Sequence, residues 1–213
     1  MKKQEEISRQ ETIAGRCLEA FVESGTLELS LDQLAAKVGI SKRMLVHYFG
    51  GREKIEETAM TLLEERLRAQ FAPEAFPPGV KIERVVAALW ERTTAPESAG
   101  VLRLVMDLSR RAWSGSARAR AFYEEQRRLW TRLLMTYWPD ESGVEELLQL
   151  YQGAVLAFLV TGDAEAGRRA LMRILARRKQ GGTRSELTGG APRRRERPKN
   201  AVHRRDTGPR RKK

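Results

Sequence analysis

Residues 35–54, AAKVGISKRMLVHYFGGREK, concentrate side chains whose chemistry suits nucleic acid. Lys42 and Arg43 begin an eight-residue stretch between two glycine-containing breaks. A guanidinium can donate two hydrogen bonds to O6 and N7 of guanine, and an ammonium can do so less rigidly. His47 and Tyr48, near the far end of the same stretch, can donate to phosphate or sugar oxygens. We therefore expect this segment to bind DNA.

Hydroxyl and basic side chains on both sides of the segment extend the expected contact surface. Hydroxyl groups and the N–H groups of helix N-termini both bind phosphate oxygens. Two basic residues shortly after the second break could hold the flanking backbone. The complete set of predicted DNA contacts is Thr26, Ser30, Ser41, Lys42, Arg43, His47, Tyr48, Arg52 and Lys54.

The sequence lacks the residue patterns of common catalytic and metal sites. It contains two histidines, His47 and His203, and one cysteine, Cys17. It has no HExxH or similar metal-ligand spacing, no glycine-rich phosphate loop and no G-x-S-x-G. We therefore expect no enzymatic activity, no catalytic residue, no metal and no cofactor.

Two short helices joined by a tight turn are needed to position the candidate DNA contacts. Ser30-Leu-Asp-Gln33 is a capping box that predicts a helix over 31–38, and Gly39 should end that helix. Ser41 can cap a second helix, which ends before Gly50-Gly51. A helix, a glycine-containing turn and a second helix form the helix-turn-helix pattern, in which the second helix enters the major groove.

Helical periodicity continues through the rest of the chain to about residue 178, without a convincing alternating strand pattern. Apolar residues recur in each segment at the spacing of an amphipathic helix. The helices expected after the motif cover 52–70, 82–90, 101–112, 116–138, 143–160 and 164–178. The sequence therefore predicts an all-α fold.

The high net charge of the chain lies in its last segment. The formal net charge is +12, and residues 177–213 contain fifteen Lys and Arg against three Asp and Glu. Residues 1–176 therefore carry no net charge, so the overall charge is no argument that the folded part binds DNA. The stretch after residue 180 is rich in Gly, Pro and Arg without periodicity, which is typical of disorder. Such a tail could be merely solvated or could bind DNA without regard to sequence.

Residues 7–56 resemble the N-terminal domain of the TetR family of bacterial transcriptional regulators. The resemblance rests on IAGRCLEAFVESG followed by SLDQLAAKVGISKRMLVHYFGGREKI, with matches at Gly39, Ile40, Ser41, Leu45, Phe49 and Glu53. Two positions depart from the family pattern. Val46 stands where an aromatic residue usually contacts phosphate, and Arg43 stands where a small residue is frequent. The family's operator sequences therefore do not carry over to this chain.

The resemblance implies a helix-turn-helix DNA-binding domain over 1–52, an effector-binding and dimerisation domain over 53–179, and a disordered basic tail over 180–213. It implies a repressor of a near-palindromic DNA operator, released when a small effector moves the helix at 52–70. The composition of the apolar faces favours a largely hydrophobic or aromatic effector, with Trp90, Met106, Trp113, Trp130 and Tyr151 as candidate contacts. The implied homodimer would pair its last two helices, with interface residues Leu147, Leu148, Tyr151, Val155, Phe158, Leu171, Ile174 and Leu175.

Cellular location and two alternative functions complete the expectations. The single cysteine and the lack of an apolar run of eighteen residues predict a cytoplasmic protein without a membrane span. The start, MKKQEEISRQ, lacks the apolar core of a signal peptide. One alternative is a sequence-tolerant nucleic-acid-binding protein driven by the basic tail, and another is a regulator without a small-molecule ligand.

Overall fold

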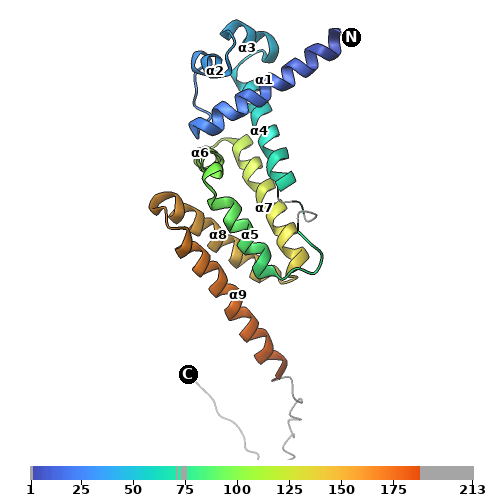
Figure 1. The fold of residues 1–213 in the computed structure, drawn as a ribbon, viewed down its shortest axis with the longest axis vertical. Helices are drawn as coiled ribbons and strands as arrows, with labels where there is room; N and C mark the ends of the chain where they lie inside the picture. Colours follow the sequence, from blue (N-terminus) through green and yellow to red (C-terminus); the bar gives the residue numbers. More distant parts are fainter. Residues whose placement is uncertain (1, 71, 73–75, 188–213) are drawn as a thin grey trace, which may run out of the picture.

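The computed structural model describes residues 2–70, 72 and 76–187, and every regular element within these ranges is helical, as expected for an all-α fold. The first three helices lie at one end of an elongated molecule, and the last helix reaches the other end (Figure 1). The helices are α1 (Lys2–Ser24), α2 (Leu31–Val38), α3 (Lys42–Phe49), α4 (Arg52–Gln70), α5 (Ile82–Thr94), the 3-10 turn η2 (Pro96–Ser98), α6 (Ala99–Trp113), α7 (Ala117–Tyr137), α8 (Glu141–Thr161) and α9 (Ala164–Leu187).

The end of α9 differs from the sequence-based expectation. The periodicity predicted a helix to about residue 178 and a disordered tail from 180, but the helix continues through Gly181-Gly182 to Leu187. An established helix gains one hydrogen bond for each residue it adds. Two glycines, at about 1 kcal/mol each relative to alanine, therefore do not have to end it. The rest of the predicted tail, 188–213, lies outside the described residues.

Buried apolar side chains form two cores, one towards each end of the molecule. The N-terminal core contains side chains of α1 to α4 together with Leu104 and Leu108 of α6 and Phe122 of α7. The C-terminal core contains side chains of α5, α8 and α9 and of the second half of α7. Helix α6 also presents Leu102 and Met106 to the C-terminal core, so α6 and α7 connect the two cores. Helix α4, which begins at the predicted domain boundary, shares the core of α1–α3. The predicted division into domains at residues 52 and 53 stays a prediction.

Helix α8 is, by length and composition alone, apolar enough to cross a membrane, and among the described helices it alone meets that criterion. It packs against α7 and α9. Its buried side chains, which include Val144 and Leu147, belong to the C-terminal core. A core helix of a water-soluble protein has the same composition, since it must be covered on more than one side.

Candidate nucleic-acid interface

Helix α2 is formed by its local sequence. The backbone N–H of Gln33 donates to the Ser30 hydroxyl over 3.1 Å, and the backbone N–H of Ser30 donates to the Gln33 side chain over 2.8 Å. Both bonds of the predicted capping box are therefore present. Gly39 ends the helix in the left-handed region at φ 77°, where a side chain would be strained. The start of the next helix is thus placed by residues within the turn.

Helix α3 begins and ends in the same way. The N–H of Met44 donates to the Ser41 hydroxyl over 3.2 Å, and Gly50 ends the helix with φ 77°. Leu45 is fully buried, and Phe49 is 6% exposed. These two side chains, four residues apart, attach one face of α3 to the N-terminal core.

The opposite face of α3 points to solvent. Lys42, Arg43, Val46 and His47 are exposed, and their spacing of i, i+1, i+4 and i+5 places them on one side of the helix. We call these four residues the reading face. The structure therefore brings together three predicted DNA contacts and the position where the family pattern has an aromatic residue.

Other contacts hold α3 against its neighbours. The Gln10 side-chain amide on α1 donates to the backbone oxygen of Tyr48 over 2.8 Å. Tyr48 itself is half-buried against the N-terminal core. Lys42 forms a 3.0 Å ion pair with Asp32 of α2, with both side chains more than half exposed. An exposed pair of this kind contributes about 0–1 kcal/mol, so the lysine could exchange Asp32 for a phosphate at little cost.

The two capping serines, Ser30 and Ser41, can still donate a hydrogen bond to a phosphate, as their predicted role requires. A serine hydroxyl that accepts a backbone N–H still has its own proton to donate. Ser30 and Ser41 are both exposed at helix N-termini, where the helix dipole and the backbone N–H groups favour an anion. Lys54, on the first turn of α4, is exposed and pairs with Glu57 over 3.0 Å.

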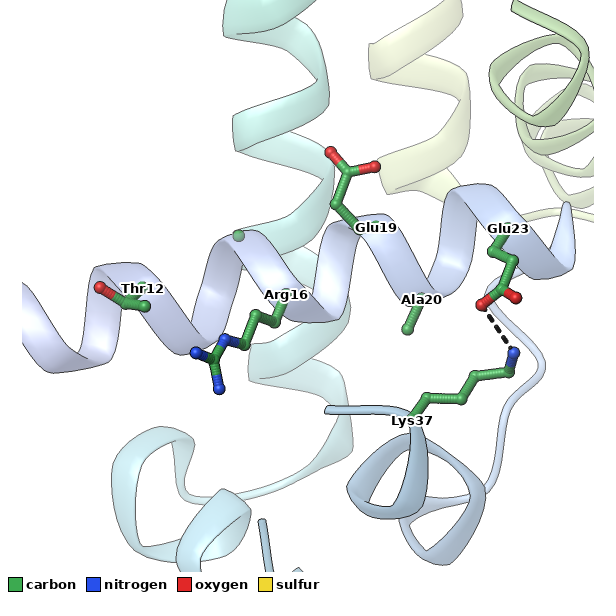
Figure 2. Close-up of a pocket in the computed structure, with 7 residues that line it drawn as sticks. Thr12, Arg16, Glu19, Ala20, Glu23 and Lys37 are labelled. Carbon is green, nitrogen blue, oxygen red and sulfur yellow. Dashed lines mark hydrogen bonds and ion pairs between the residues drawn. The ribbon is translucent and has the colours of Figure 1, made fainter. Parts of the chain in front are cut away.

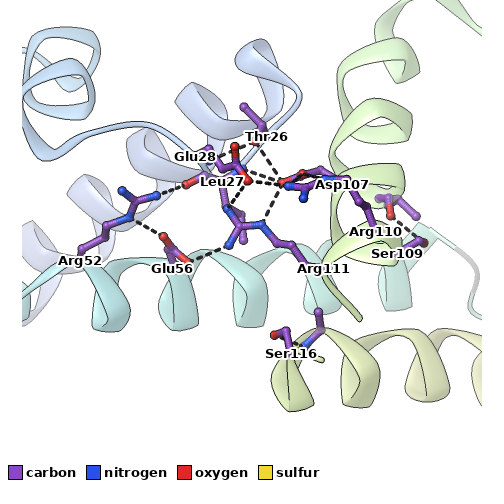
Figure 3. A network of polar contacts seen from close by, with 12 residues as sticks. Thr26, Leu27, Glu28, Arg52, Glu56, Asp107, Ser109, Arg110, Arg111 and Ser116 are labelled. Carbon is purple, nitrogen blue, oxygen red and sulfur yellow. Dashed lines mark hydrogen bonds and ion pairs between the residues drawn. The ribbon is translucent and has the colours of Figure 1, made fainter. Parts of the chain in front are cut away.

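Two other predicted DNA contacts, Thr26 and Arg52, form hydrogen bonds with groups of the same chain (Figure 3). The Thr26 hydroxyl donates its one proton to Asp107 of α6 over 3.0 Å, so it has none left for a phosphate. Arg52 donates to Glu56 over 2.7 Å and to the backbone oxygen of Leu27 over 3.0 Å. The spacing along the sequence did not reveal these partners, because Asp107 lies 81 residues beyond Thr26.

A shallow groove of about 640 Å³ lies between α1 and α2 (Figure 2). Across it, Lys37 of α2 forms a 2.9 Å ion pair with Glu23 of α1. The groove is lined by charged and small side chains rather than by the aromatic set expected for an effector. The lining residues are Thr12, Gly15, Arg16, Glu19, Ala20, Glu23 and Lys37.

The candidate effector residues are divided by the structure. Trp90 and Tyr151 are buried in the C-terminal core, with ring centroids 5.5 Å apart, and Trp130 packs against Tyr151 at 5.2 Å. Met106 is half-buried against the same core. Trp113, at the end of α6, is 88% exposed and does not join this aromatic cluster. Its role as an effector contact stays a prediction, and periodicity did not indicate this exposure because it cannot tell where a helix passes beyond its covering neighbours.

Most of the predicted dimer residues are buried within the single chain. Their exposed fractions are no more than 9%, apart from the half-buried Phe158 and Ile174, so they pack α8 and α9 into the C-terminal core. The residues concerned are Leu147, Leu148, Tyr151, Val155, Leu171 and Leu175. The apolar side chains that α8 leaves in solvent are Leu156, 56% exposed, and Val160, 77% exposed.

Several solved structures share this arrangement of helices. A TetR-family transcriptional regulator from Streptomyces coelicolor superposes with a TM-score of 0.69 at 20% identity, covering 85% of each chain. A putative TetR-family regulator from Rhodococcus sp. gives 0.63 at 16% identity, covering 79% of this chain and 97% of that one. A putative transcriptional regulator from Pseudomonas aeruginosa PAO1 gives 0.61 at 18% identity, over 84% and 93% of the two chains. At these identities the likeness shows the fold.

One curated protein is related over part of the sequence. An uncharacterized HTH-type transcriptional regulator of Pseudomonas putida, TtgW, is 27% identical over 88 residues, which are 40% of this chain and 63% of that protein. No family model matches the chain.

Proposed function

We propose that this chain, which has the fold of the TetR-family transcriptional regulators, is itself a DNA-binding regulator of that family, more specifically a repressor. The observation that carries the proposal is the reading face of α3, which points outwards because Leu45 and Phe49 anchor the opposite face in the N-terminal core. A short helix anchored on one side and polar on the other has the geometry needed in a major groove.

The reading face supports a division of roles among its residues. Lys42 and Arg43 stand at the N-terminal end of α3, which approaches base edges in helix-turn-helix proteins. Val46 is 39% exposed and cannot donate a hydrogen bond, but its methyl groups suit the methyl group of thymine. Ser41 and His47 lie on either side of these positions and would bind phosphate.

Selection of binding sites from random duplex DNA, followed by footprinting of the DNA upstream of the chain's own gene, tests the proposal. We expect a near-palindromic site whose half-sites lie about 34–36 Å apart, or a multiple of that spacing. Arg43→Ala should weaken binding by about 1–3 kcal/mol and relax the sequence preference. Arg132→Ala, an exposed arginine of α7, is the matched control and should bind like the wild type. Equal affinity for selected and random DNA would instead favour the sequence-tolerant alternative.

The outward face of α8 supports a homodimer. Leu156 and Val160 lie there with Gly153 and Ala157, which are exposed and small enough for a second helix to approach closely. Large apolar side chains in solvent often mark an interface. A two-fold dimer through this face would present two reading faces to a near-palindromic operator. Sedimentation of Leu156→Glu tests this arrangement, and an unchanged dimer would contradict it.

A small effector, the released state of the repressor and a cytoplasmic location complete the proposal. Gln126 of α7 has a buried side-chain nitrogen without a hydrogen-bond partner among the described residues. It lies one turn before Trp130, so a largely apolar ligand with one acceptor could bind between Gln126 and the aromatic cluster. Gln126→Leu should then reduce release from the operator without weakening operator binding.

The proposed cytoplasmic location is supported by the buried free thiol of Cys17, which suits a reducing compartment.

A further inference from the structure

Asp107 of α6 is the centre of a polar network between the two ends of the molecule (Figure 3). One carboxylate oxygen accepts from the Thr26 hydroxyl at 3.0 Å, from the Leu27 backbone N–H at 3.2 Å and from Arg111 at 3.1 Å. The other oxygen accepts two bonds from Arg110, at 2.8 and 3.2 Å. The side chain is 10% exposed. Two of its five bonds go to the connector between α1 and α2, so α6 holds that connector directly.

The network closes into a ring through α4. Arg111 also pairs with Glu56 over 3.4 Å, Glu56 pairs with Arg52 over 2.7 Å, and Arg52 donates to the backbone oxygen of Leu27. Leu27 thus has its N–H bound by α6 and its carbonyl bound by α4, while its side chain is 2% exposed. Glu28 extends the network by pairing with Arg110.

Close packing at the other end of α6 supports the same joint. A Cβ atom on Gly100 would lie 2.5 Å from the backbone oxygen of Val22 in α1, and a Cβ on Gly25 would lie 2.7 Å from Cβ of Arg103. Both distances, one between carbon and oxygen and one between two carbons, are shorter than non-bonded contacts in folded proteins. Helix α6 therefore lies close against the end of α1, with Gly100 against the Val22 backbone and the Arg103 side chain against Gly25.

The electrostatics of the joint depend on an ionised Asp107. Burial raises the pKa of this carboxyl, but the bonds from Arg110, the Leu27 N–H, Thr26 and Arg111 outweigh burial and leave the pKa below its usual value of 3.8. A neutral side chain at this position would leave the two arginines without their shared carboxylate. The joint is therefore sensitive to a change in this one group.

Helix α6 faces the C-terminal core with its other side. Leu102 and Met106 pack against that core, while Leu104 and Leu108 pack in the N-terminal core. Met106 directly precedes Asp107, so a displacement of α6 by a change in the C-terminal core carries the carboxylate with it.

We propose that Asp107 is a positioning residue, which locks the α1–α2 connector to α6 so that the orientation of α2 and α3 follows the movement of α6. The inference deepens the proposed function and rests on it, since the orientation of α3 matters only if α3 binds DNA. It adds a second mechanical connection beside α4, because the ring joins α6, α4 and the connector.

Distance measurement between two spin labels tests the positioning role without DNA. Ala36→Cys on α2 and Arg132→Cys on α7 are exposed positions, and the native Cys17 is fully buried, so labelling is selective. Diluting labelled chains with unlabelled chains keeps the measured distance within one chain. Asp107→Asn keeps the size of the side chain and removes its charge, and Glu145→Gln removes the exposed 2.8 Å pair between α8 and Arg127 as a control.

We expect Asp107→Asn to broaden the distance distribution and Glu145→Gln to leave it unchanged. Thr26→Val, which removes the hydroxyl but keeps the branched shape, should also broaden it, and Thr26→Ser should restore the wild-type distribution. The Thr26 pair decides the question if Asp107→Asn does not fold. A wild-type distribution in the folded Asp107→Asn or in Thr26→Val would overturn the proposal.

Binding to the selected DNA site separates this inference from the proposed function. We expect Asp107→Asn to bind about tenfold more weakly, within the usual range of coupling between sites. Broadened distances with unchanged affinity would overturn the link to DNA binding. If the wild-type chain binds no DNA site, the proposed function fails, while the distances still decide whether Asp107 holds the joint.

Discussion

A methyl group added at Gly167 tests the packing of the C-terminal core. A Cβ at this position of α9 would lie 2.3 Å from Cζ2 and 2.6 Å from Cη2 of Trp90, whereas carbon atoms in contact are about 3.5 Å apart or more. The indole would therefore have to move by about 1 Å. It has little room, because it is 1% exposed and packs edge-on against Tyr151 and Phe158.

The expected loss of stability follows from three contributions. Overpacking of a filled core costs about 1–3 kcal/mol. Displacement of the indole also weakens the 2.9 Å bond from Trp90 Nε1 to the Ala164 oxygen, at about 1 kcal/mol. The higher helix propensity of alanine offsets about 1 kcal/mol. Gly167→Ala should thus lower the free energy of unfolding by about 2 kcal/mol and the melting temperature by about 4–8 °C.

Thermal unfolding monitored by circular dichroism provides the measurement, with Gly15→Ala as the matched control. Gly15 also lies within a helix, and a Cβ there meets no atom within 4 Å, so the same substitution should stabilise by about 0.5–1 kcal/mol. Protein concentration must be equal in all samples, because dimerisation shifts the melting temperature. A Gly167→Ala variant that melts as high as Gly15→Ala would refute the packing argument.

Four further predictions use single substitutions or reagents. Ser41→Ala removes the acceptor for the Met44 N–H and should cost about 1 kcal/mol in urea unfolding; no measurable loss would contradict the cap. Because the folded pKa of Asp107 is lowered, its ionised form stabilises the fold above the unfolded pKa, and this contribution is lost as the pH falls through the folded pKa. The stability difference between wild type and Asp107→Asn should therefore shrink below about pH 4, and a constant difference down to pH 2 would argue against it. The Cys17 thiol, whose pKa burial raises to about 11, should react with a thiol reagent at pH 8 only after unfolding, and rapid labelling of the native protein would disprove this. Gly153→Ala places a methyl group in open space in the single chain, so it should weaken dimerisation only if the interface lies on α8. We expect weaker dimerisation in sedimentation, and unchanged dimerisation would argue against an interface there.

The elements of the reading face could be predicted because their causes are local. Ser30 and Gln33 cap each other across three residues, and Ser41 and Gly50 bound an eight-residue helix by the same short-range rules. Each of these signals acts within one turn of the chain, so it can be read without knowledge of the fold. The outward position of Lys42 and Arg43 follows from the helical period once Leu45 and Phe49 are taken as buried.

Positions that depend on distant neighbours were harder to predict. Periodicity indicates that one side of α8 is apolar, but Leu147 and Leu148 face the chain's own core whereas Leu156 and Val160 face solvent. For the same reason, periodicity did not show that Trp113 is exposed. The crossing of helices decides which side is covered, and that crossing depends on side chains far apart in the sequence.

The sequence by itself determined the helices, their caps and the polar surface that α3 exposes to solvent, because these depend on neighbours within a few residues. Only the tertiary structure decided that Thr26 and Arg52 belong to an internal joint and that Asp107 holds it. The physical reason is that a buried carboxylate needs several donors at once. Here those donors come from two segments about eighty residues apart, which only the packing of α6 against the α1–α2 connector brings together.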